Sequence, residues 1–180
     1  MSVNEFAAQI HETVKKILSE IHTAVPGRII SYDAQTGLAT VQPQAKRKIP
    51  DGRSIDYPYI AGVPVLFPSA GNRFACITFP IRENDGCLLI FAESSLDDWL
   101  KGGESKDPRR FDLTDAICIP GLWNRPLQTS LQFTEDVVIQ NSFAMIRLTP
   151  GGGIVIDNTG GTTTINGNLH VNGQISSTGG

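Results

Sequence analysis

The chain has 180 residues, a formal net charge of −3, 18% charged residues and 18 glycines. This length allows one ordinary domain, or one small domain with appendages. The weak negative charge gives no electrostatic basis for binding nucleic acid or an anionic membrane surface.

The N-terminus carries acidic residues early and lacks the apolar stretch of a signal peptide, and no 18 apolar residues follow one another anywhere. We therefore expect the protein to be made and assembled in the cytoplasm.

Cys76, Cys87 and Cys118 each lie inside an apolar stretch and lack the spacing of metal ligands. We expect all three to be small buried side chains, with no disulfide framework.

Residues 1–25 are predicted to form an N-terminal unit whose helix runs from residue 3 to about residue 24. Ser2 or Asn4 can cap its start, and Pro26-Gly27 is predicted to end it. Its apolar residues recur at three- and four-residue spacing and are Phe6, Ile10, Val14, Ile17, Leu18 and Ile21. This stripe either packs on its own domain or docks on a neighbouring subunit.

Residues 26–125 are predicted to form a small β-barrel. A hairpin is expected over 28–43, with its turn at Asp33–Gly37, and Pro50-Asp51-Gly52 marks a second turn. Apolar strands are expected at IAGVPVLFP (60–68), FACITFPI (74–81), GCLLIFAE (86–93) and AICIPGLW (116–123), with a short helix within 94–103. Strands at this spacing, with no alternating helices, indicate a barrel.

Residues 126–180 are poor in charge, and short strands are expected at LQFTEDVVIQ, AMIRLTP, GGIVIDN, TTTING and LHVNGQI. From Thr164 to Ser177 the residues alternate strictly, with one parity apolar or glycine and the other polar. The large members of the apolar parity are Ile165, Leu169, Val171 and Ile175. This strand has too few large side chains to form its own core, so partner chains, most simply copies of itself, must cover it. Two Asn-Gly hairpins are the alternative, which the unbroken parity disfavours.

No pattern typical of catalysis or metal binding is present. The histidines are His11 and His22, predicted as surface or interface residues of the helix, and His170, predicted on the wet face of the terminal strand. Adjacent carboxylates lie in polar turns or helix starts, where solvated or capping roles are expected. Trp99 and Trp123 are predicted to pack in a core or interface, and Arg109-Arg110 to lie in a solvated loop. We therefore predict no catalytic residue, no cofactor and no metal.

The order of helix, small barrel and charge-poor strip resembles the central baseplate spike proteins of contractile-tailed phages, of the phage Mu and phage phi92 type. NDGCLLIFAESSLDDWL (84–100) is similar to a family stretch that ends a barrel strand, and PGRIISYDAQTGLATVQP (26–43) looks like the opening hairpin of the family's OB-fold. TTINGNLHVNGQI (163–175) looks like the family's triple-stranded β-helix. The resemblance covers most of the chain from Pro26 onward.

The resemblance implies a mainly β homotrimer in the virion, with OB-fold collars at the baseplate and an intertwined β-helix over 126–180 that punctures the host outer membrane on tail contraction. The trimer core would be formed by Ile165, Leu169, Val171 and Ile175, and the helix stripe would dock on the tail hub. The family's His-x-His iron motif is missing, because Val171 and Asn172 follow His170. Either a separate tip protein caps the trimer or the chain is truncated.

Three other readings stay open. A receptor-binding tail fibre or adhesin would carry a bulky aromatic-rich distal domain, which this sequence lacks. A wall-degrading spike would need an inserted domain with an acidic pair, and no segment between barrel and strip is long enough. The spike of a tailocin or secretion system would share the whole architecture.

Overall fold

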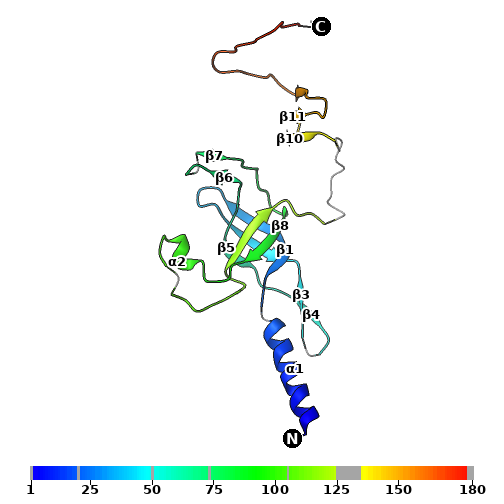
Figure 1. Ribbon diagram of the computed structural model, residues 1–180, viewed down its shortest axis with the longest axis vertical. Coiled ribbons are helices and arrows are strands. Elements are labelled where there is room, and N and C mark those ends of the chain that lie inside the picture. Colours follow the sequence, from blue (N-terminus) through cyan, green and yellow to red (C-terminus); the bar gives the residue numbers. More distant parts are fainter. Residues whose placement is uncertain are drawn as a thin grey trace. The chain divides into compact units, whose positions relative to one another are not determined.

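The computed structural model describes residues 2–19, 21–49, 51–72, 74–104, 106–124 and 135–177. The chain divides into two compact units, Met1–Gln128 and Thr129–Gly180, which are described separately (Figure 1). The predicted boundary at residue 126 lies outside the described residues. Both units are mainly β, which confirms the predicted class.

The elements of the first unit are α1 (Val3–Ser19), β1 (Ala24–Asp33), β2 (Leu38–Pro43), β3 (Lys46–Lys48), β4 (Ser54–Asp56), β5 (Ile60–Pro64), β6 (Ser69–Ala70), β7 (Ala75–Cys76), β8 (Gly86–Phe91), α2 (Asp97–Leu100) and β9 (Ala116–Pro120). Those of the second unit are β10 (Val137–Asn141), β11 (Ala144–Leu148) and β12 (Ile154–Asn158).

The predicted N-terminal helix is confirmed, and Ser2 caps it. The Ser2 hydroxyl accepts a hydrogen bond from the Glu5 backbone N–H at 3.2 Å, and the Glu5 carboxylate accepts one from the Ser2 nitrogen at 2.7 Å. This reciprocal pair is a capping box. The predicted helix end near residue 24 is wrong, because α1 ends at Ser19 and Pro26-Gly27 lies inside β1. The backbone from Ala24 onward pairs with β8, and this pairing stops the helix earlier.

The main sheet of the first unit has the strand order β5-β2-β1-β8-β9, and every neighbouring pair is antiparallel. A parallel bridge between Val65 and Cys118 brings the chain after β5 against β9, and the Leu66 N–H donates to the Cys118 carbonyl at 2.8 Å. The sheet therefore curls into a half-barrel (Figure 1). This five-stranded, partly open arrangement fits the predicted OB-like fold.

The predicted hairpin and its turn are confirmed by β1, β2 and the Asp33 side chain. The Asp33 carboxylate accepts hydrogen bonds from the Gln35 N–H at 2.9 Å and the Thr36 hydroxyl at 2.8 Å. Gly37 then closes the turn with a φ of 74°, in the left-handed region that favours glycine. The bond from the Gln35 N–H, followed by that from Thr36, lowers the pKa of Asp33.

The core of the first unit lies inside the curl of the sheet. Alternate residues of its strands point inward, and the buried apolar set is Ile29, Ala39, Val41, Ile60, Val63, Cys87, Leu89, Phe91, Ala116 and Cys118. Burial of Cys87 and Cys118 confirms the prediction for these two thiols. A hydrogen bond with Cys87, together with burial, raises the pKa of Cys118.

The predicted burial of Cys76 is wrong, as is most of the predicted strand over 74–81. Cys76 is exposed, and only Ala75–Cys76 is a strand. That strand pairs with β6 alone, so the hairpin does not join the main sheet. Phe74, Ile77 and Phe79 are consequently exposed, although their sequence is as apolar as that of a core strand.

The second unit contains one antiparallel sheet in the order β10-β11-β12. Its strands confirm the first three short strands predicted after residue 126. The strands predicted at TTTING and LHVNGQI do not form in the single chain, and neither do the alternative Asn-Gly hairpins, since residues 162–177 belong to no strand. An isolated strip has no neighbouring backbone with which to form a ladder.

The half-barrel core gives a stability prediction. Leu89→Ala should lower the free energy of unfolding of the first unit by about 2–5 kcal/mol, because Leu89 is fully buried and its removal leaves a cavity. Trp99 and Trp123 are the chain's two tryptophans and both lie in this unit, so their fluorescence during urea unfolding reports on it. Ile90→Ala, at the exposed neighbouring position, is the control. Equal losses in both variants would contradict this core.

Candidate assembly surfaces

The apolar stripe of α1 is exposed along its whole length. Phe6, Ile10, Val14 and Ile17 keep 47–56% of their surface accessible, and no residue of the helix is buried. Ile21, predicted as part of the stripe, follows the helix and is exposed as well. Within the described residues nothing covers this stripe, which is the expected condition of a surface that docks on another protein.

The terminal strip presents the four side chains predicted for a trimer core. Ile165, Leu169, Val171 and Ile175 have accessible fractions between 43% and 76%. All described residues from Thr159 to Ser177 are exposed, so the strip packs on no core within the described part of the second unit. The role of these four residues as a trimer core stays a prediction.

A second apolar surface lies on one face of the β10-β11-β12 sheet and was not singled out by the sequence. The strand register places Val137, Leu148 and Ile154 in one row and Ile139, Ile146 and Ile156 in the next. All six side chains are exposed, with accessible fractions between 41% and 70%. The six residues are called the aliphatic face below. Each strand shows period-two alternation in the sequence, but the alignment of the six residues into rows depends on the register in which the strands pair.

The opposite face of this sheet carries the charge. Arg147 pairs with Asp136 at 2.9 Å and with Asp157 at 3.6 Å, and its side chain is largely covered. Because neighbouring residues of a strand point to opposite faces, Arg147 and Asp157 lie on the face opposite Ile146 and Ile156. The sheet thus has one face that carries the ion pairs together with the half-buried Val138, Met145 and Val155, and one face that is aliphatic and exposed.

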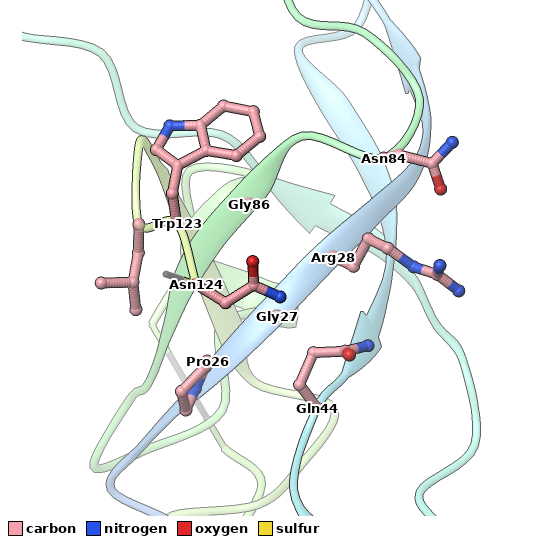
Figure 2. Close-up of a pocket in the computed structure, with 9 residues that line it drawn as sticks. Pro26, Gly27, Arg28, Gln44, Asn84, Gly86, Trp123 and Asn124 are labelled. Carbon is pink, nitrogen blue, oxygen red and sulfur yellow. The ribbon is translucent and has the colours of Figure 1, made fainter. Parts of the chain in front are cut away.

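In the first unit, Trp123 lines two cavities. One, of about 250 Å³, lies beside the start of β1 and is lined by Pro26, Gly27, Arg28, Gln44, Asn84, Gly86, Leu122, Trp123 and Asn124. Figure 2 shows Trp123 and Asn124 on one side of this cavity and Arg28, Gln44 and Asn84 across β1 from them. The other, of about 350 Å³, includes Phe79, Ile81 and Asp85 in its lining.

Gly86 allows the segment that carries Trp123 to lie directly on β8. A Cβ atom at Gly86 would come within 2.0 Å of the Leu122 carbonyl oxygen, so any other residue would push the segment away. The Gly121 N–H donates to the Gly86 carbonyl at 2.9 Å. Trp123 is nevertheless 43% accessible and Trp99 is more exposed still, so neither packs in a core of the described chain, and the interface packing that was the other option for them stays a prediction.

Arg109 is bound into a network, which corrects its prediction as a solvated loop residue. Its Nη2 donates to the Ser95 hydroxyl at 2.7 Å and to the Asp97 carboxylate at 2.6 Å, and its Nη1 donates to the Thr114 hydroxyl at 2.9 Å. The hydrogen bond with Asp97 raises the pKa of Arg109. These bonds connect the chain before β9 to the start of α2.

Asp115 supplies the buried end of this network. Its side chain is 2% accessible, and it accepts a hydrogen bond from the Leu96 N–H at 2.9 Å. The Arg109 guanidinium lies 3.8 Å from the same carboxylate oxygen. A carboxylate removed from water in this way needs such partners. The network fixes α2, which presents Trp99 and Leu100 to solvent.

The histidines do not form a site. His11 is exposed on α1, as predicted. His22 is not on the helix but packs against the rings of Tyr57 and Phe91, with centroid distances of 5.6 and 5.5 Å. His170 is exposed, and its Nε2 lies 2.8 Å from the Asn172 side-chain oxygen. Among the described residues, no three histidine, cysteine or acidic side chains are grouped so that they could hold a metal.

No α-helix in the described part of the chain has the length and apolar character needed to cross a membrane. α1 has 17 residues and carries charged side chains near both ends.

A model of the phage protein Gp138 N-terminal domain family matches residues 25–121. The matched segment is just over half of the chain and runs from the second residue of β1 to just past the end of β9, so it contains all but one residue of the half-barrel strands. The chain belongs to the Gp138 N-terminal domain family. It is therefore a phage structural protein, in agreement with the broad class that the sequence predicted. No curated protein matches the chain.

Within this Gp138-type domain, Asp112 should make stability depend on pH. Its carboxylate accepts hydrogen bonds from the Thr114 hydroxyl at 2.6 Å and the Thr114 N–H at 2.8 Å, and these bonds lower the pKa of Asp112. A lowered pKa stabilises the fold above the unfolded value of about 3.9, and this contribution is lost as pH falls through the folded pKa.

Asp112→Asn keeps an acceptor oxygen but has no charge. We expect the variant to melt at a lower temperature than the wild type at pH 6, and the difference to vanish as the pH approaches 2. Thermal melts followed by tryptophan fluorescence measure this difference. A difference that stays constant over the whole range would contradict the role of the Asp112 charge.

Proposed function

We propose that this phage protein is a trimeric central spike of a contractile tail, a baseplate component that punctures the host outer membrane on tail contraction. The terminal strip carries the proposal. One chain presents four large aliphatic side chains along it, exposes all of them and gives their backbone no strand partner among the described residues. Three copies wound about one axis would cover the side chains and pair the backbone groups.

A rod built in this way suits mechanical work. Its strands would run between chains, so pulling one chain out would break many backbone hydrogen bonds at once. Strands that wind around a closed axis also leave no long open edge for aggregation. The described strip carries no charged residue after Asp157, so no charged side chain would need to be dehydrated inside the rod.

The stripe of α1 would attach the spike to the tail hub. An isolated helix of this length is marginal in water, and it spans only about 25 Å at 1.5 Å per residue. Covering Phe6, Ile10, Val14 and Ile17 with a hub protein would stabilise the helix and anchor the spike together. Contact with the outer membrane would be transient, and no nucleic acid, metal or cofactor would take part.

We propose no enzymatic role for this protein. The cavity in Figure 2 brings together one guanidinium, three amides and an indole, which can bind a ligand but are poorly suited to transfer protons near neutral pH. A tailocin or secretion-system spike would use the same architecture, and the family membership favours the phage.

The mass of the purified protein tests the trimer. Size-exclusion chromatography with light scattering should give about three times the 19.5 kDa of one chain, and the trimer should persist in mild denaturant. A stable monomer would contradict the spike, because an uncovered strip cannot form a rigid rod.

Substitutions on α1 test the hub contact. Ile10→Ser combined with Ile17→Ser should leave a soluble protein of unchanged mass that no longer enters tails, because the stripe loses its apolar centre. Incorporation is measured by complementing a phage that lacks the gene and quantifying the spike in purified tails. The control replaces Glu12 and Lys15, an exposed ion pair at 3.5 Å. Normal incorporation of the Ile10 and Ile17 variant would exclude this docking surface.

A further inference from the structure

We propose that the aliphatic face of the β10-β11-β12 sheet packs against the same face of two other copies of this chain, forming a three-sided prism. The inference rests on the trimer of the proposed function and adds a surface and an assembly mode that the trimer alone does not specify. In the prism each side is a complete sheet from one chain, and the three aliphatic faces meet at the axis.

The aliphatic face has the composition of a buried surface. Each of its two rows has one residue from every strand, and all six are valine, leucine or isoleucine. The next row, formed by Asn141, Ala144 and Asn158, bounds the face at one end. A three-stranded sheet needs its apolar face covered to be stable in water, and the described chain does not cover this one.

Copies of this chain are the partner that the surface fits. The aliphatic face carries no charged or hydrogen-bonding side chain, so it offers nothing to orient a polar partner, whereas three identical faces match one another row by row. The face is also continuous in sequence with the terminal strip, whose exposed Ile165, Leu169, Val171 and Ile175 have the same character. Three chains around a single three-fold axis can therefore bury both the aliphatic face and the terminal strip.

The backbone pairing decides how the copies meet. β11 forms five-residue ladders with β10 and β12 inside one chain, so the middle strand has no free edge. Copies can therefore join here by packing faces, without exchanging strands. This differs from an intertwined helix over all of 126–180. The ion-paired face with Arg147, Asp136 and Asp157 would point to solvent.

Ile139→Asp tests the surface in the full-length protein. The variant places a charge in the middle of the aliphatic face, so the trimer should be absent or should dissociate at a lower urea concentration than the wild type, as measured by light scattering. The control is Gln140→Asp, which adds the same charge on the opposite face of the same strand. Equal dissociation curves for the wild type and both variants would overturn the proposal and would favour cover by the chain's own strip or by another protein.

Cysteine cross-linking tests the arrangement without disrupting the face. In a Cys76→Ser background the remaining native thiols, Cys87 and Cys118, are buried. Ile146→Cys lies on the middle strand, nearest the axis, and should form a disulfide between copies on mild oxidation, because facing residues near the axis come within disulfide reach. Met145→Cys, on the opposite face, should not.

The trimeric spike and the prism are contradicted by different results. A wild-type protein that is monomeric would remove the proposed function and this inference together. A wild-type trimer that does not cross-link through Ile146→Cys, and that tolerates Ile139→Asp, would keep the spike and overturn the prism alone.

Discussion

A β-sheet with one apolar face is stable in water only when something covers that face. The first unit meets this requirement within one chain, because its five strands curl and the bridge between Val65 and Cys118 brings the two ends of the sheet together. The inward residues then cover one another. The described part of the second unit has three strands, too few to curl in this way, and the apolar side chains on one face of its sheet remain exposed.

This contrast separates the roles of the two units. The half-barrel is a self-sufficient scaffold, and the Gp138-type match covers it. Local contacts hold α2 and the segment after β9 against this scaffold. The Arg109 network binds the start of α2, and Leu122 lies close to Gly86. α1 and the second unit instead expose ordered apolar surfaces, which is the arrangement of parts that fold or dock against other chains.

The distribution of charge supports the same division. In the second unit the ion pairs of Arg147 gather on one face of the sheet, while the other face and the large side chains of the terminal strip are aliphatic. This segregation would orient a subunit in an assembly, because the ion-paired face is best left in water and the aliphatic face needs to be covered. In the proposed spike, the same burial that selects the partner chains would also stiffen the assembly.

The sequence by itself determined the elements whose signals are local. The cap at Ser2, the Asp33–Gly37 turn and the first three short strands predicted after residue 126 follow from neighbouring residues, and the structure contains them. Only the tertiary structure decided the end of α1, the exposure of Cys76 and Trp99, the burial of Asp115 and the rows of the aliphatic face. Each of these depends on which distant segment supplies a backbone or side-chain partner, and no local pattern encodes that choice.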